Sequence, residues 1–509
     1  MPVDPSASII LCTLNAKYIH ASLGLRYLYA NMAELQPTCV IKEYTVQKRR
    51  EEIAEELLIL QPQIIGIGVY IWNTQACLEL LAIIKKVAPE VVLVVGGPEI
   101  SFETNDQGIT QYSDYVICGQ ADLAFHSLCQ SIRQGVTPKQ KIIQAPSFKL
   151  DQINFPYDYY NQEDINNRVI YVEASRGCPY KCEFCLSSLD KTATPFALET
   201  FLYHMDRLYQ RGVRHFKFVD RTFNLNINSS LKILHFFLDK ADPDIFLHFE
   251  LIPDHLPEKL KDTIALFPAG TLQFEIGIQS FNNACQALIS RKQDNNRAEE
   301  NLRWLRQFSS AHLHTDLIAG LPGEDMQSFA AGFDKLVSLD PHEIQVGLLK
   351  RLKGTPINRH SSAFAMVYHV TAPYTLLSNR DISFAEMQQI ARFSRYWDLI
   401  ANSGRFSRAL KLILGQTPFR RFMLLSDTLF AKTGQTHKIE LRRLFILLRT
   451  ILTDEPFNID VDLVTRTLTE DFNSGGYRKG LPEFVKQQRI ANTAINNNTA
   501  NRRQKRHQH

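Results

Sequence analysis

Three cysteines stand close together in Ser175-Arg-Gly-Cys-Pro-Tyr-Lys-Cys-Glu-Phe-Cys-Leu186, which directly follows the apolar run 169–172. Cys178, Cys182 and Cys185 are spaced C-x3-C-x2-C, and three such thiolates can ligate three irons of a [4Fe–4S] cluster and leave the fourth iron open. With 9 cysteines in 509 residues, chance would give this spacing only about 0.003 times per chain. The alternatives are three unrelated core thiols or a zinc site, which would need a fourth protein ligand that does not follow in the loop.

The cysteine loop resembles the signature loop of the radical S-adenosylmethionine (SAM) superfamily, in which the residue before the last cysteine is usually aromatic, as Phe184 is here. The resemblance implies that Cys178, Cys182 and Cys185 hold a [4Fe–4S] cluster whose open iron binds the amino and carboxylate groups of SAM. It also implies reductive cleavage of SAM to a 5′-deoxyadenosyl radical, with the electron from a reductant such as flavodoxin or ferredoxin. The protein's own share is then to bind, to orient and to exclude water.

The composition is that of a globular protein with real cores. A length of 509 residues fits about three domains, and 45% of the residues are apolar. The N-terminus lacks the basic and apolar segments of a secretory signal, and no apolar run approaches the ~20 residues of a membrane-spanning helix. Nine cysteines at scattered spacings argue against a disulfide framework. We therefore expect a soluble cytoplasmic protein with reduced thiols.

Residues 1–143 alternate short apolar runs with helix-patterned segments. This order predicts a doubly wound parallel sheet of Rossmann type, whose ligands bind beyond the carboxyl ends of the strands. The Gly-Gly-Pro-Glu turn at 96–99 and the Cys-Gly-Gln-Ala-Asp turn at 118–122 resemble loops of the cobalamin-binding domains that often precede radical SAM barrels. The resemblance implies that cobalamin contacts strand ends at Tyr70, Thr74, Gly96, Gly97, Glu99 and Gly119.

One feature of the cobalamin-binding family is absent from the sequence. The D-x-H-x-x-G motif that supplies a histidine to cobalt does not follow the first strand, where Asn15 and His20 stand at a different spacing. Many fused radical enzymes of this type lack that histidine as well, so cobalamin stays an expected cofactor. The alternative is a vestigial domain that serves packing or substrate contact.

A polar linker, residues 144–168, leads to a second α/β segment at 169–356. Six apolar runs alternate with helical patterns there, which is two units short of a closed eight-stranded barrel. A partial (β/α)6 barrel is what the radical SAM superfamily uses, with function at the carboxyl ends of the strands. The resemblance implies that SAM is surrounded by Phe184, Asp220, Glu275, Gln279, Ser280, Ile318 and Gly320. Taken singly, such residues also fit surface ion pairs or ordinary turns.

Residues 357–490 are predicted to form a mostly α-helical domain, and the polar tail 491–509 is expected to be disordered. Ser383 predicts a helix start with Glu386 as its capping-box partner. The segment 396–405 resembles the tail domain of a subgroup of cobalamin-type radical enzymes whose reaction is unassigned.

The net charge of +4 is carried by the basic residues of the last nine positions, and the rest of the chain is balanced. The distribution is uneven, because residues 401–450 hold 10 basic and 2 acidic side chains. Such a stretch predicts either a polyanion-binding face or a solvated helix surface. If it faces the opening between the N-terminal sheet and the cysteine loop, with the helical domain as its cover, it would favour an anionic substrate such as a phosphorylated metabolite or RNA. RNA is the less favoured of these, because the chain shows no RNA-binding module.

The sequence therefore predicts a radical SAM enzyme, and the resemblance to cobalamin-type members implies methylation of an unactivated carbon. A second enzymatic interpretation is a radical rearrangement, cyclisation or oxidation without methyl transfer. A third, from another class, is a non-catalytic regulator that binds cobalamin or a cluster. The substrate, a small or anionic molecule, is not identified by any motif.

Overall fold

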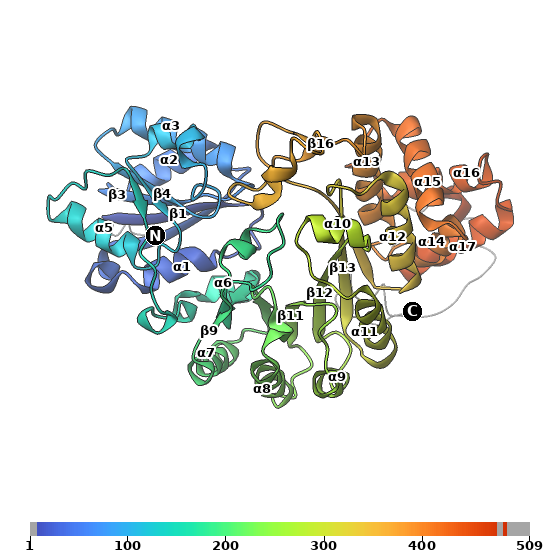
Figure 1. Ribbon diagram of the computed structural model, residues 1–509, viewed down its shortest axis with the longest axis horizontal. Helices are drawn as coiled ribbons and strands as arrows, with labels where there is room; N and C mark the ends of the chain where they lie inside the picture. The colour runs from blue at the N-terminus through green and yellow to red at the C-terminus, as the bar shows by residue number, and fades with distance from the viewer. Residues whose placement is uncertain (1–7, 476–481, 486–509) are drawn as a thin grey trace.

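The computed structural model describes residues 8–475 and 482–485, so the tail expected at 491–509 lies outside the described residues. Figure 1 shows an N-terminal α/β body beside a second α/β body, with a helical body at the end far from the N-terminal one. This arrangement confirms the predicted fold class of doubly wound sheet, partial barrel and helical region. Among the described residues, none of the helices has both the length and the apolar character that crossing a membrane would require.

The N-terminal sheet has six parallel strands in the order β2-β1-β3-β4-β5-β6. All seven residues of β1 are buried, because helices cover both faces of the sheet. One core lies under α2 and α3, and the other lies under α1 and α5. The elements are β1 (Ile9–Asn15), α1 (Leu23–Ala30), η1 (Ala33–Thr38), β2 (Cys39–Thr45), α2 (Arg50–Leu58), β3 (Ile64–Gly68), α3 (Thr74–Val87), β4 (Val92–Gly96), η2 (Thr104–Asp106), α4 (Ile109–Tyr112), β5 (Tyr115–Cys118), α5 (Ala124–Arg133) and β6 (Ile142–Gln144).

The segment 144–168, predicted as a polar linker, is folded and packed. Tyr157 and Tyr160 are buried in the core of the second α/β body. Arg26 of α1 pairs with Asp164 at 2.7 Å, and both side chains are buried. The segment thus fixes the N-terminal domain against its neighbour. Its elements are η3 (Leu150–Gln152), η4 (Tyr157–Tyr159) and α6 (Gln162–Asn167).

The second sheet also has six parallel strands, in the order β14-β13-β12-β11-β10-β7, and its two edge strands do not pair with each other. It is therefore a partial barrel that is open between β7 and β14. The elements are β7 (Ile170–Val172), β8 (Ser175–Arg176), η5 (Leu186–Leu189), β9 (Thr194–Pro195), α7 (Leu198–Gln210), β10 (His215–Phe218), η6 (Phe223–Leu225), α8 (Ile227–Leu238), β11 (Phe246–Leu251), α9 (Glu258–Ala265), β12 (Leu272–Gln279), α10 (Asn283–Leu288), α11 (Asn295–Phe308), β13 (His312–Ala319), α12 (Met326–Ser338) and β14 (Glu343–Leu348).

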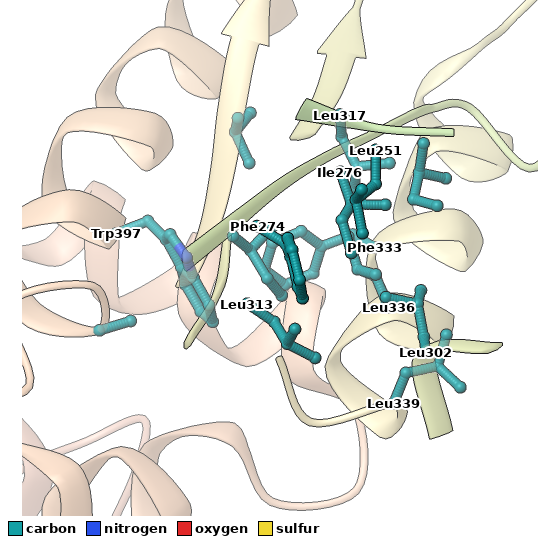
Figure 2. Packing of buried hydrophobic residues seen from close by; sticks show 14 of the residues in the cluster. Leu251, Phe274, Ile276, Leu302, Leu313, Leu317, Phe333, Leu336, Leu339 and Trp397 are labelled. Atoms are coloured by element: carbon teal, nitrogen blue, oxygen red, sulfur yellow. The ribbon is translucent and has the colours of Figure 1, made fainter. Parts of the chain in front are cut away.

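Burial alternates along the barrel strands, because successive side chains point to opposite faces of a sheet. In β12 the buried positions hold apolar residues such as Phe274 and Ile276, and the positions between them hold Gln273, Glu275 and Gln279. Figure 2 shows Phe274 beside Leu313 and Ile276 beside Leu251 and Leu317, with residues of the covering helices packed against them. The apolar core therefore lies between the outer face of the sheet and the covering helices, and the inner face carries polar side chains such as Glu275.

The C-terminal region begins with a strap, residues 350–378, that crosses to the N-terminal domain. In this strap Tyr374 donates a hydrogen bond to Glu99 at 2.7 Å, and Arg351 pairs with Glu103 at 2.8 Å. Helix α13 packs on α15 and against β14, and α14–α17 lie at the far end of the molecule (Figure 1). The strap, rather than the helical bundle, thus spans the space between the N-terminal sheet and the barrel. The elements are η7 (Pro356–His360), β15 (Val367–Tyr368), β16 (Leu376–Ser378), α13 (Phe384–Ile400), α14 (Ser407–Leu414), α15 (Pro418–Thr433), α16 (Leu441–Thr453) and α17 (Val461–Ser474).

Candidate functional site

The three loop cysteines line one cavity of about 230 Å³ at the carboxyl ends of the barrel strands. Cys178 and Cys182 are buried, and Cys185 is half-buried. All three carry free thiols. Within the described residues no three metal-binding side chains surround one ion position, which a cluster with one iron per thiolate does not require.

Local contacts hold the cysteine loop in shape. Gly177 has φ of +90°, and a Cβ there would clash with the carbonyl oxygen of Thr192. The Ser188 hydroxyl donates to the carbonyl oxygens of Cys182 at 2.9 Å and Cys185 at 2.7 Å. The buried Glu183 carboxylate lies 2.9 Å from the His360 ring. The loop is thus fixed to the chain that follows the barrel.

Gln279 carries the clearest mark of a ligand site. Its φ is +68°, a strained conformation for a residue other than glycine, and its buried side-chain oxygen has no hydrogen-bond partner among the described residues. Its amide nitrogen lies where a Cβ on Gly277 would stand. Phe184 and Glu275 line the same cavity. A buried acceptor without a donor fits a bound group that carries hydroxyls or an ammonium.

The other predicted SAM residues are outside the lining of this cavity. Asp220 accepts hydrogen bonds from the Ala174 amide at 2.9 Å and the Ser175 hydroxyl at 2.6 Å, and its burial raises the pKa of that carboxyl to about 7. Ser280 donates to Glu324 at 2.5 Å. Ile318 packs against the barrel core, and the carbonyl of Gly320 accepts from Asn379 at 3.1 Å.

Six charged residues outside the predicted site residues line the cysteine cavity as well: Arg221, Glu250, Asp254, Arg291, Lys292 and Asp316. Arg221 pairs with Glu250 at 2.6 Å, and an Arg291 N–H donates to the Cys182 sulfur at 3.7 Å. Glu250 lies directly opposite the predicted residue Glu275 in the pairing of β11 with β12. The alternation of side chains along these two strands could therefore have identified Glu250 from the sequence.

A second cavity, of about 330 Å³, lies in the N-terminal domain. Of the predicted cobalamin residues, Tyr70, Gly96, Gly97 and Gly119 line it. Gly24, Gly66 and Gly68 line it as well, so that much of its wall is backbone. Such a glycine-lined cradle fits a large flat ligand that lies against main chain.

Two predicted cobalamin residues are outside that lining. The Thr74 hydroxyl donates to the carbonyl oxygen of Tyr70 at 2.9 Å, and the buried Glu99 pairs with Lys353 of the strap at 3.2 Å. His20 is outside it too, because its Nδ1 lies 2.7 Å from the Tyr171 hydroxyl of β7. Among the described residues, no histidine lines the N-terminal cavity.

The cysteine loop forms part of both cavities. Arg176, Gly177 and Asp190 line the N-terminal cavity, and the cysteines beyond them line the barrel cavity. Arg176 pairs with Asp122 of the N-terminal domain at 3.0 Å and with Glu173 at 2.9 Å. These carboxylates raise the pKa of the Arg176 guanidinium. The salt bridges therefore hold the two cavities on either side of one short loop.

Comparison with known proteins agrees with this architecture. A B12-binding domain model matches residues 10–128, a radical SAM superfamily model matches 172–336, and a model for a protein of unknown function (DUF4080) matches 362–509. The chain therefore carries a radical SAM domain between an N-terminal B12-binding domain and a C-terminal DUF4080 domain. These matches confirm the predicted cofactor set of [4Fe–4S] cluster, SAM and cobalamin.

Individual relatives are distant. The cobalamin-dependent radical SAM methyltransferase TokK of Streptomyces tokunonensis is 24% identical over 343 residues, 59% of this chain and 48% of TokK. An uncharacterized methyltransferase of Pyrococcus horikoshii is 27% identical over 42% of this chain and 51% of its own. The chain thus spans about half the length of these curated relatives.

Solved structures show the same fold at lower identity. The cobalamin-dependent SAM radical enzyme OxsB, with aqua-cobalamin and SAM bound, covers 95% of this chain and 83% of its own, with a TM-score of 0.60 and 14% identity. The radical SAM methyltransferase TsrM of Kitasatospora setae, with cobalamin and a [4Fe–4S] cluster bound, covers 72% of this chain and 76% of its own, with a TM-score of 0.57 and 16% identity.

Proposed function

We propose that this protein is a cobalamin-dependent radical SAM enzyme that transfers a methyl group to an unactivated carbon. The observation that carries the proposal is the cysteine loop itself, which lines the barrel cavity on one side and the N-terminal cavity on the other. When bound, the cluster and SAM supply a radical and cobalamin supplies a methyl group. The names of the methyltransferase relatives support the same reaction.

In this proposal Cys178, Cys182 and Cys185 ligate the cluster. The unpaired oxygen of Gln279 accepts a hydrogen bond from SAM, and Phe184 gives an apolar wall. Asp220 and Ser280 bond to the protein's own groups, so we assign them positioning roles.

We assign the remaining predicted SAM residues, Glu275, Ile318 and Gly320, to the same SAM site. Glu275 borders it with an ionised carboxylate, since a hydrogen bond from His248 at 3.0 Å helps to lower the pKa of Glu275 to about 2 against the opposing effect of burial. The backbone of Ile318 and Gly320 remains our candidate for the adenine contact.

For cobalamin we propose the glycine-lined cavity, with Tyr70, Gly96, Gly97 and Gly119 in contact. Thr74 and Glu99 then support the turns rather than touch the ligand. Since no histidine lines this cavity among the described residues, its lining would offer cobalt no imidazole. Electron paramagnetic resonance of the Co(II) form tests this on the chain labelled with ¹⁵N-histidine, because the axial nitrogen coupling changes on labelling only if a histidine is the ligand.

The reaction is tested with the anaerobically reconstituted chain, hydroxocobalamin, SAM and a low-potential reductant. We expect S-adenosylhomocysteine and 5′-deoxyadenosine to form together, because a methylase consumes SAM in both ways. 5′-Deoxyadenosine alone would favour rearrangement, cyclisation or oxidation, and sustained absence of both products would favour a regulator. A reductant such as flavodoxin or ferredoxin and a reducing compartment such as the cytoplasm complete the proposal, in keeping with nine free cysteines.

A further inference from the structure

The inside of the partial barrel holds a third cavity, of about 1130 Å³, which we call the barrel chamber. Its walls are the inward side chains of the strands, the loop at 19–20, part of the strap and helix α13. Glu275 lines both the barrel chamber and the cysteine cavity. This carboxylate therefore stands at the border between the chamber and the proposed SAM site.

The wall of the chamber carries several charged side chains among apolar ones. Glu275 lies 3.0 Å from His248 and 3.9 Å from Lys217. His314 lies 3.3 Å from Asp316, which lines the cysteine cavity, yet the facing Nε2 and Oδ1 atoms are buried without a hydrogen bond. A hydrocarbon in the chamber would displace water from the charged groups that line it and offer them no hydrogen bond in return, which costs free energy. The charged groups of the chamber therefore favour a ligand with polar groups of its own.

The charges of the chamber are balanced. Its lining holds three cations and three carboxylates, from both the barrel and the C-terminal region: Lys217, Lys350, Arg395, Glu275, Glu343 and Asp398. The basic residues of α14–α17 are absent from this lining, so the local charge excess at 401–450 gives no support to a polyanion at the barrel. Charges of both signs on the walls of one cavity are complementary to a ligand that carries both signs itself.

Helix α13 and Asn402, which follows it, pack against the free edge of β14 on the open side of the barrel. The Asn402 side chain accepts from the amide of Ile344 and donates to its carbonyl oxygen, both at 3.0 Å, and the Ser394 hydroxyl donates to the carbonyl of Val346 at 2.6 Å. These bonds occupy the free edge of β14 and present Arg395 and Asp398 to the chamber. The DUF4080 region thus supplies a wall of the chamber.

We propose that the barrel chamber is the substrate site and that it takes a small zwitterionic metabolite of amino-acid type, held between Lys217 or Arg395 and Glu275 or Glu343. This inference rests on the proposed function only for the reaction that the bound molecule undergoes, and not for its binding. It assigns α13 the role of recognising substrate. The size of the chamber suits molecules from a single amino acid to a short peptide.

The test measures binding without turnover. The full chain with its cluster reconstituted, in the absence of SAM, is heated with each of the twenty standard amino acids and a set of dipeptides. Matched probes are the corresponding decarboxylated amines and deaminated acids, together with decanoate and bulk tRNA. We expect at least one zwitterion to raise the unfolding midpoint by about 2 °C, and its single-charge analogues to raise it less. No shift with any zwitterion, or a shift with decanoate or tRNA alone, overturns the proposal.

Variants locate the binding. Arg395→Ala, at an exposed position of α13, and Lys217→Met should each weaken binding of the stabilising zwitterion at least tenfold. Arg443→Ala, at an exposed position of α16 outside the chamber, should bind it as the parent does. Equal binding by Arg395→Ala and Lys217→Met would place the ligand elsewhere. The outcome is separate from the test of the proposed reaction. A zwitterion can bind to a chain that forms no S-adenosylhomocysteine, and a chain that forms S-adenosylhomocysteine can fail to bind any zwitterion.

Discussion

The two sheets of this protein have the same strand number and parallel pairing but offer ligands different surfaces. The N-terminal sheet is covered by helices on both faces, so a ligand can contact only the edge of the sheet and its backbone. Several glycines line the cavity there. The barrel sheet is covered on its outer face alone, and its inner face keeps charged side chains such as Lys217 and Glu275. A cofactor held by shape fits the first surface, and a reaction that needs directed polar groups fits the second.

The strongest test of this contrast removes the cluster ligands. Replacing Cys178, Cys182 and Cys185 together by alanine should abolish bound iron and sulfide and all formation of 5′-deoxyadenosine, because no other thiol lines the barrel cavity among the described residues. Cobalamin binding should persist, since the N-terminal cavity contains none of the three. Iron content, product analysis and the cobalamin spectrum measure this. Cys285→Ala, at a buried position away from the cavity, is the control that should keep its iron. Four irons per chain in the triple variant would exclude these ligands.

The next test acts on the N-terminal side. Gly97 has φ of +114°, and an added Cβ would lie 2.5 Å from the carbonyl oxygen of Val69. Gly97→Ala should cost about 2–4 kcal/mol from backbone strain and overpacking and weaken cobalamin at least tenfold, while iron content stays unchanged. Equilibrium dialysis with hydroxocobalamin measures it.

Gly135→Ala is the matched control for Gly97→Ala. Gly135 has φ of +75° but nothing within 4 Å of the added Cβ, so we expect only about 1 kcal/mol of strain and normal cobalamin binding. If the two variants bound cobalamin equally well, close backbone approach at Gly97 would not matter for the ligand.

The sequence predicts the fold well because its signals are local. The apolar runs, the cysteine loop and the capping box at Ser383 each depend on neighbours in the chain, and the structure confirms that capping box. Strand β6 was not predicted, since three residues carry too little pattern. The rest depends on distant contacts. Asp220 was placed near SAM by its position after a strand, yet its carboxylate bonds to the chain 45 and 46 residues earlier, and the partner of Arg176 is 54 residues away.

A pH test addresses the buried polar groups that support the barrel. Burial raises the pKa of Glu324 to about 7 from an ordinary value of 4.5. The folded state therefore holds this proton more tightly than the unfolded state, so stability is fullest below pH 4.5 and falls as the pH rises to about 7. Glu324→Gln removes the titration, and the free energy of unfolding of the variant relative to the parent should rise by up to about 3 kcal/mol over that window.

Urea denaturation at several pH values measures the effect of Glu324. Ser280→Ala sharpens the result, because loss of the Ser280 hydroxyl, which donates to Glu324 at 2.5 Å, should raise the pKa of Glu324 further and extend the window to higher pH. A difference between Glu324→Gln and the parent that does not vary with pH would contradict the raised pKa.

The smallest effect is expected where neither cofactor cavity is involved. Ser383 caps α13 by accepting from the Glu386 amide, and the Glu386 carboxylate accepts from the Ser383 amide at 2.8 Å. Ser383→Ala should cost about 1 kcal/mol, because the first turn of the helix loses its acceptor. Hydrogen exchange of the first-turn amides of α13 should accelerate, with iron and cobalamin contents unchanged. The wall residues Arg395 and Asp398 stand about three and four turns further on, so binding in the barrel chamber should change little. Unaltered exchange at Glu386 would show that the cap does not stabilise α13, and lost iron or cobalamin would mean that this helix supports the two cofactor cavities more directly than its contacts indicate.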